Sequence, residues 1–182
     1  MPGLGTIVNV AAILLGGLAG MLGGKLIPDR YQKALLSAMG VSVLFVGLAG
    51  ALSQMLYAED GTLHTQGTMM LIISLAAGAI LGELLDLEDR MERFGAWLRE
   101  KSGSQSDNSF INGFVTASLT VCIGAMAIVG AIQDGISGDH ATLFAKAVLD
   151  FVIVLVMAAS MGKGCMFSAI PVGILQGGVT LL

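Results

Sequence analysis

Two ionisable residues, Lys146 and Asp150, lie inside an apolar stretch of the chain, residues 141–161. They are four residues apart, so on a helix both side chains face the same way. A charged side chain at the centre of a membrane helix costs about 2.5–3.5 kcal/mol, so such residues are rare there. The pair predicts one of two roles. It is an ion pair that fixes helix packing, or Asp150 is a functional group that binds a proton, a cation or a substrate amine. A third arrangement has Lys146 extended outward and Asp150 neutralised by protonation.

Further polar residues are positioned to line one polar pathway together with this pair. Gln133 and Asp134 end the preceding apolar stretch, while Asn9 and Gln176 lie within the first and last stretches. An amide in an apolar span needs a hydrogen-bond partner on another helix, which is either structural or a ligand contact. We expect these four residues to line a polar pathway with Lys146 and Asp150. Asp139 and His140 are expected in a solvated turn, and a single histidine predicts no metal site.

The sequence lacks the residue patterns that other kinds of chemistry require. The sequence contains no nucleophile with an adjacent base, no paired-carboxylate site and no phosphate-binding loop, so we predict no catalytic residues and no cofactor. A membrane enzyme that acts on lipid is the weakest of the alternatives. There is no basic patch with interleaved aromatic residues, which argues against nucleic-acid binding. The two cysteines form neither a disulfide framework nor a metal-binding spacing.

The amino-acid composition indicates the environment in which these residues lie. Of the 182 residues, 55% are hydrophobic and 12% are charged, whereas soluble domains carry about 25% charged residues. The charges cluster between long apolar runs, each near the ~20 residues that a membrane helix needs. We therefore predict an all-α, polytopic bundle in the lipid bilayer. Its six expected spans are residues 4–24, 34–56, 67–85, 110–133, 141–161 and 164–182.

The distribution of lysine and arginine predicts the orientation. Of the nine, all except Lys146 lie in alternate loops on one side, and the opposite loops, 57–66 and 134–140, contain none. Positive residues favour the cytoplasmic side, so both chain ends are expected outside the cytoplasm. No positive charge precedes the first apolar run, which favours a retained helix over a cleaved signal peptide.

Glycine and proline positions suggest how the spans pack. Gly16, Gly20 and Gly24 recur every four residues, which clears one helix face for close approach of a neighbour. Pro171 lacks a backbone donor, so we expect a kink in the last span that exposes backbone carbonyls to protein or to a cavity.

Residues 84–101 have a different pattern. Apolar residues recur there at steps of three and four with charged residues between them, which predicts an amphipathic helix. We expect it along the cytoplasmic membrane surface, with Trp97 at headgroup depth. Residues 102–109 read as a flexible linker. The surface helix also supports a second hypothesis, a non-transporting scaffold or regulator.

A short internal repeat relates the two halves. Residues 31–37 (YQKALLS) and 144–150 (FAKAVLD) match in pattern, each near the start of the second span of a three-span unit. Because each unit has three spans, the second unit, residues 110–182, crosses the membrane in the opposite orientation to the first, residues 1–101. Inverted repeats are common in transporters, whose sites lie at the repeat interface. We therefore favour a transporter or channel for a small polar solute or ion, in a homo-oligomer.

Longer motifs carry a family resemblance over essentially the whole chain. They are GTIVN at 5–9, GELL at 82–85, CIGAMAIVGAIQDGISGDH at 122–140, KAVLD at 146–150 and FSAIPVGILQGGVTLL at 167–182. The sequence resembles the YqgA-like bacterial inner-membrane family. The resemblance implies a polytopic protein of the bacterial inner membrane and supplies no catalytic residues. Members typically continue with further apolar sequence, so this chain is expected to be a shortened form or to lack the final helices.

Overall fold

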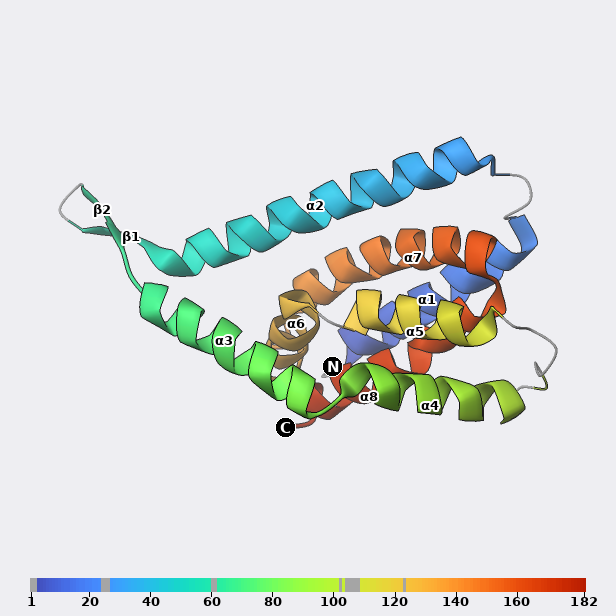
Figure 1. The fold of residues 1–182 in the computed structure, drawn as a ribbon. Helices are drawn as coiled ribbons and strands as arrows, with labels where there is room; N and C mark the ends of the chain where they lie inside the picture. Colours follow the sequence, from blue (N-terminus) through green and yellow to red (C-terminus); the bar gives the residue numbers. More distant parts are fainter. Residues whose placement is uncertain (1–2, 24–26, 60–61, 102, 104–108, 123) are drawn as a thin grey trace.

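The computed structural model describes residues 3–23, 27–59, 62–101, 103, 109–122 and 124–182. Within these ranges the chain is all-α apart from one short hairpin (Figure 1). The elements, in order, are α1 (Leu4–Gly23), α2 (Asp29–Met55), β1 (Leu56–Glu59), β2 (Thr62–Thr65), α3 (Thr68–Leu84), α4 (Leu87–Lys101), α5 (Phe110–Cys122), α6 (Ala125–Ile136), α7 (Ala141–Met161), the 3₁₀ helix η2 (Lys163–Ser168) and α8 (Ala169–Thr180).

Helices α1 and α7 pack closely at the centre of the bundle, beside α5, α6 and α8 (Figure 1). Glycines on α1 permit this approach, as expected for Gly16 and Gly20. A Cβ atom on Gly16 would lie 2.5 Å from the carbonyl oxygen of Phe151, and one on Gly20 would overlap the carbonyl oxygen of Leu155. Gly24, the third glycine of the predicted face, lies outside the described residues.

The expected span 110–133 corresponds to two helices, α5 and α6, which together can form one bent span. The axes of α5 and α6 differ by 59°. Gly124, at the start of α6, has the extended backbone angles φ 179° and ψ 146°, which no residue inside a helix adopts. The bend was not evident from the sequence, because a glycine in an apolar run has the same appearance whether it packs or breaks a helix.

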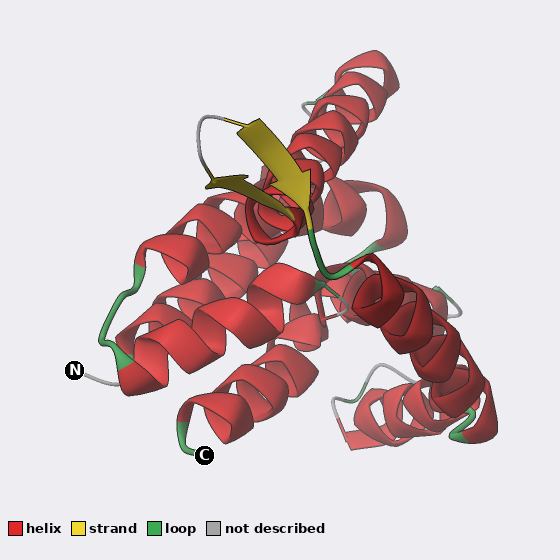
Figure 2. Cartoon of the chain, turned by 90° about the vertical axis from the view of Figure 1, so that its left-hand side faces the viewer, coloured by secondary structure: helices red, strands yellow, loops and turns green. Residues whose placement is uncertain are grey.

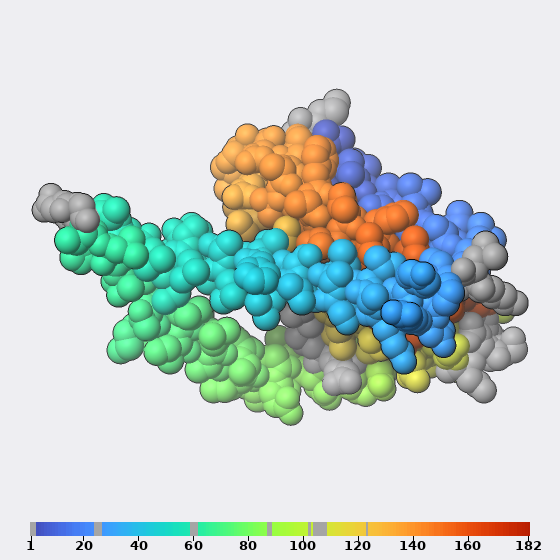
Figure 3. Space-filling model, turned by 90° about the horizontal axis from the view of Figure 1, so that it is seen from above, coloured from blue at the N-terminus to red at the C-terminus, as the bar shows by residue number. Residues whose placement is uncertain are grey.

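Helices α2 and α3 form an arm with the hairpin at its tip. Strands β1 and β2 pair antiparallel, with Leu56 opposite Thr65, where the sequence suggested only a loop. Figure 1 shows the hairpin away from the helical bundle, Figure 2 views the molecule from the hairpin end, and Figure 3 shows α2 along the outside of the molecule. Only Gln32 is buried on α2, and no residue is buried on α3.

Helix α4 lies against α5 in the structure. Its apolar face contributes Leu98, which is buried with Phe110 and Phe114, and Phe94, whose ring meets the edge of Phe114 at 5.8 Å between centroids. The amphipathic pattern of residues 84–101 is thereby explained, because its apolar side covers α5. Trp97 is 52% exposed.

The last predicted span, residues 164–182, is divided between η2 and the 12-residue α8. Helix α7 ends at Met161, and the φ of +86° at the following Gly162 favours glycine. The change from 3₁₀ to α geometry falls at Ser168 and Ala169. Pro171 follows in the first turn of α8, where its missing N–H is tolerated, so the change of helix geometry precedes Pro171 and does not fall at it.

Three described helices, α1, α2 and α7, are each long and apolar enough to cross a membrane. The number rises to five if the bent pairs α3–α4 and α5–α6 each form one span.

Candidate functional site

Lys146 and Asp150 form a buried ion pair on α7. The Lys146 ammonium donates a 2.6 Å hydrogen bond to Asp150 Oδ2. Both residues are nearly inaccessible, Lys146 at 6% and Asp150 at 3%. The i, i+4 spacing that suggested a shared helix face therefore yields direct contact, and Lys146 does not extend outward to solvent.

Two amides from other helices complete this group. Asn9 on α1 donates through Nδ2 to Asp150 Oδ2 at 3.0 Å and to Gln176 Oε1 on α8 at 3.2 Å. Both amide residues are fully buried. Among the described residues, Asn9 Oδ1 and Gln176 Nε2 have no hydrogen-bond partner. Buried polar atoms are usually paired, so each unpaired atom suggests a place for a water or a ligand. We name Asn9, Lys146, Asp150 and Gln176 the central polar group.

The break between α5 and α6 faces this group. Lys146 Nζ also donates to the carbonyl oxygen of Val121 at 2.7 Å. Val121 lies in the last turn of α5, where carbonyls lack partners within the helix and the helix dipole is negative. The ammonium therefore joins a side-chain carboxylate to the carbonyl end of a broken helix.

A cavity of about 120 Å³ adjoins the ion pair. Its walls include Val43 and Gly47 of α2, Val121 and Gly124 at the helix break, and Lys146 and Asp150 of α7. A water molecule occupies ~30 Å³ of liquid, so the space is sufficient for a few waters or a small solute. The charged pair is thus close-packed on one side and adjoins open space on the other.

A second polar cluster lies where α6 ends and α7 begins. Asp134 on α6 is fully buried. Its Oδ1 contacts His140 Nδ1, which precedes α7, and accepts the backbone N–H of Gly5 on α1 at 3.4 Å. Its Oδ2 is buried without a partner among the described residues. We name Gly5, Asp134 and His140 the outer polar cluster.

Two threonines lie between the outer polar cluster and the central polar group. The hydroxyls of Thr6 on α1 and Thr180 on α8 are 3.4 Å apart, and both residues are buried. Thr6 is three residues from Asn9, and Thr180 is four from Gln176, so each shares a helix face with its amide. The clusters and this threonine pair form a polar row through the otherwise apolar packing of α1, α6, α7 and α8.

The structure brings together only some of the residues predicted for the pathway. It brings Asn9, Lys146, Asp150 and Gln176 together and places Asp134 in the outer polar cluster. Gln133 is partly buried and accepts a 2.7 Å hydrogen bond from Thr142 on α7.

Sequence reasoning missed some participants. Asp139 is exposed, as expected, but His140 is only 18% exposed in its side chain and pairs with Asp134, so its assignment to a solvated turn was wrong. The Val121 carbonyl and the Gly5 amide are backbone groups, which residue type does not reveal. Thr6 and Thr180 share helix faces with Asn9 and Gln176, a spacing that was available in the sequence.

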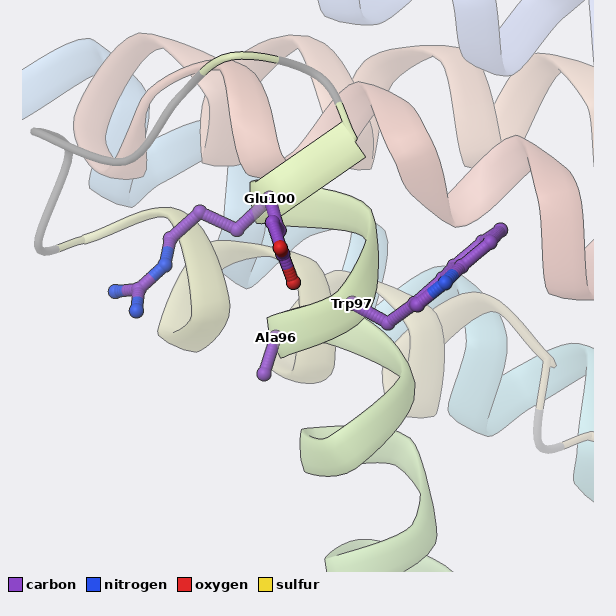
Figure 4. Close-up of a pocket in the computed structure, with 4 residues that line it drawn as sticks. Ala96, Trp97 and Glu100 are labelled. Atoms are coloured by element: carbon purple, nitrogen blue, oxygen red, sulfur yellow. The ribbon is translucent and has the colours of Figure 1, made fainter.

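Helix α4 carries a separate surface depression of about 570 Å³, lined by Ala96, Trp97, Arg99 and Glu100. Figure 4 shows Ala96 and Trp97 pointing to different sides of the helix instead of converging. The depression is therefore open surface on one helix, without the inward-facing groups of a built site.

Comparisons with known proteins cover nearly the whole chain. Residues 4–182 match the family described as "Protein of unknown function (DUF554)". The chain is 30% identical over 177 residues to the uncharacterized membrane protein YdfK of Bacillus subtilis, with 97% of this chain and 71% of YdfK covered. It is 28% identical over 177 residues to the uncharacterized protein YqgA of Escherichia coli, covering 95% and 71%.

No solved structure matches the chain. The family match confirms the resemblance inferred from the sequence motifs. On this evidence the chain belongs to the DUF554 family.

Proposed function

We propose that this protein is an integral membrane transporter or channel that moves a small polar solute or ion along the polar row. One observation carries the proposal. Asn9 of α1 and Lys146 of α7 both bond the buried Asp150, and they connect it to Gln176 of α8 and to the carbonyl end of α5, beside a cavity at a helix break. Non-helical backbone at membrane depth is tolerated where it is buried in protein or lines a water-filled cavity.

The surface of the arm supports a membrane location. Large apolar side chains are exposed along α2 and α3, among them Phe45 at 65% and Met70 at 77%. A helix that is apolar all round belongs in a protein core or in lipid. The relative YdfK is described as a membrane protein. We assign this chain to the bacterial inner membrane, as a multi-pass protein.

The positions of basic residues support an orientation. Arg30 and Lys33 lie near the start of α2, Arg99 and Lys101 at the end of α4, and Lys163 at the start of η2. These helix ends lie together on the right in Figure 1, opposite the hairpin. By the positive-inside rule this end is cytoplasmic, and the N-terminus is outside.

The repeat remains part of the proposal. The matching segments 31–37 and 144–150 both lie near the N-termini of long helices, α2 and α7. These helices run in opposite directions in Figure 1, as an inverted repeat requires. We accordingly propose six spans in two units, residues 1–101 and 110–182, joined by the linker 102–109. The homo-oligomer stays a prediction that the molecular mass in detergent can test.

In this mechanism Asp150 supplies the negative charge that an ion or a proton recognises, and Lys146 neutralises it in the empty state. Asn9 orients the carboxylate, because its Nδ2 reaches both Asp150 and Gln176. The outer polar cluster lies at the extracytoplasmic end of the row. Closely packed glycines keep α1 beside α7 along the row.

A scaffold or regulator acting through α4 is the second candidate. One observation favours it. The apolar face of α4 is covered by α5, whereas Trp97 and the ion-paired Asp89 and Arg93 are exposed, where a partner can reach them. This role requires no function of Asp150.

The test is flux in liposomes that contain the purified protein. We expect transport of a panel of small ions and polar solutes to reveal one that wild type moves and Asp150→Asn does not. Asp139→Asn is the matched control, because Asp139 is exposed and an amide oxygen can still accept the N–H of Ala141. Full flux with a folded Asp150→Asn protein would remove Asp150 from the mechanism. The absence of any wild-type flux would favour the scaffold.

A further inference from the structure

We propose that the Lys146 ammonium occupies a binding site for a small monovalent cation, and that the transported or coupling ion exchanges with it there. The inference rests on the proposed transport function and specifies the chemical class of its ion. It follows from the atoms around Nζ, from the balance of buried charge and from the adjoining cavity.

The partners of the ammonium are those that an alkali or small ammonium ion would use. Nζ is 2.6 Å from Asp150 Oδ2 and 2.7 Å from the Val121 carbonyl oxygen. Both are oxygen atoms, and the carbonyl lies at the negative end of α5. Asn9 Oδ1, buried and without a partner among the described residues, belongs to a side chain whose Nδ2 bonds the same carboxylate. Transporters with broken helices bind cations through such carbonyls at helix C-termini.

The balance of buried charge at Asp150 favours a bound ion with a single positive charge. Lys146 is the buried cation of the described residues, whereas the other lysines and arginines of that part of the chain are exposed or partly exposed. A buried carboxylate left without its partner is strongly destabilising. A single monovalent cation preserves the neutrality of the pair when the ammonium moves away, whereas an anion or a divalent cation does not.

The geometry also leaves room for exchange. The cavity of about 120 Å³ borders both Lys146 and Asp150. Lysine carries its charge on a flexible four-carbon stem, so the ammonium can leave Asp150 while a hydrated ion enters from the cavity. The ammonium then acts as a tethered cation that closes the empty site.

The first test removes the lysine side chain that holds the ammonium in the site. In Lys146→Ala, the Asp150 carboxylate loses its positive partner and gains space beside it, so on this proposal a cation from the buffer takes the place of the ammonium. We would measure the melting temperature of the purified protein in sodium, potassium and methylammonium chloride against choline chloride at equal ionic strength. We expect a rise of about 5 °C or more in at least one small cation at saturation.

Two controls should show no such rise, and wild type should show a smaller one, because its own ammonium competes with the added cation for the site. Lys33→Ala removes an exposed lysine at the corresponding position of the repeat, with the same change in net charge. Lys146→Ala/Asp150→Asn removes the carboxylate as well. An unresponsive Lys146→Ala protein, or a rise of equal size in the double variant, would overturn the proposal. If Lys146→Ala folds in no cation while the double variant folds, the proposal also fails.

A second test uses wild type and so does not depend on whether variants fold. If a cation displaces the ammonium, saturating sodium, potassium or methylammonium should increase acetylation of Lys146 by acetic anhydride several-fold over choline, read by mass spectrometry against exposed Lys33. Equal labelling of Lys146 in all salts would contradict exchange.

The flux assay separates this inference from the proposed function. A cation response without wild-type flux means that the cation site exists in a protein that does not transport. Flux that depends on Asp150 without a cation response means that the protein transports a different class of solute.

Discussion

Asn9 donates a 3.0 Å hydrogen bond to Asp150, a residue 141 positions later in the chain. The same Nδ2 donates to Gln176 Oε1, so one amide connects α1, α7 and α8 at a fully buried position. These contacts hold the charged residue of α7 in place and connect it to the polar row that reaches the outer polar cluster.

Replacing Asn9 by Ala should lower the stability of the protein. It removes a donor from Asp150 and leaves Gln176 Oε1 buried without a partner, which costs about 1–3 kcal/mol. The measurement is resistance to thermal unfolding in detergent. Asn112→Ala is the control, because Asn112 is exposed on α5, and it should be neutral. Equal stability of the two variants would contradict a structural role for the Asn9 amide.

The contacts of the outer polar cluster lead us to predict a similar loss of stability when His140 is replaced. His140→Ala removes the side-chain partner of the fully buried Asp134 carboxylate and leaves it with the backbone N–H of Gly5. We expect a loss of about 1–3 kcal/mol, as for other groups left unsatisfied in a protein interior. The comparison is His64→Ala in the exposed hairpin, measured by the same unfolding assay. A larger loss at His64 than at His140 would argue against this cluster.

Close contact between α1 and α7 predicts that Gly20 cannot carry a side chain. A Cβ at Gly20 would overlap the Leu155 carbonyl oxygen, and backbone atoms cannot move aside as a flexible side chain can. Gly20→Ala should therefore destabilise the protein by about 1–3 kcal/mol, as overpacking does. Gly23→Ala, where nothing lies within 4 Å, should leave the melting temperature unchanged or raised. Tolerance of both substitutions would contradict the described packing.

Much of this fold was predictable because long apolar runs identify long helices. The predicted span 141–161 coincides with α7, Ala141–Met161, and the first predicted span, 4–24, corresponds to α1. The break at Gly124 and the 3₁₀ geometry of η2 were not predictable. The geometry of η2 depends on where backbones meet, as at Gly164 against the Phe110 carbonyl oxygen, and apolar composition is the same on either side of the break at Gly124.

The candidate site was predictable to the extent that side chains define it. The spacing of Lys146 and Asp150 fixed a shared helix face, and buried amides such as Asn9 and Gln176 required partners. The sequence does not show which amide meets which charge, since that depends on how α1 and α8 pack on α7. It also conceals the Val121 carbonyl, because every residue possesses one.

The most direct test of the central claim is whether the site at Asp150 is reached by water within the membrane. A cysteine at Gly124 would report this in a Cys122→Ala/Cys165→Ala background, because Gly124 lines the cavity and a Cβ added there would meet nothing within 4 Å. Val148→Cys is the control, because Val148 lies on α7 between Lys146 and Asp150 and is 67% exposed, away from the cavity lining.

Maleimides react with the thiolate, which forms in water and not in lipid. In intact membranes we therefore predict rapid N-ethylmaleimide labelling of Gly124→Cys and little labelling of Val148→Cys. Equally slow labelling of both would contradict a water-accessible pathway at Asp150.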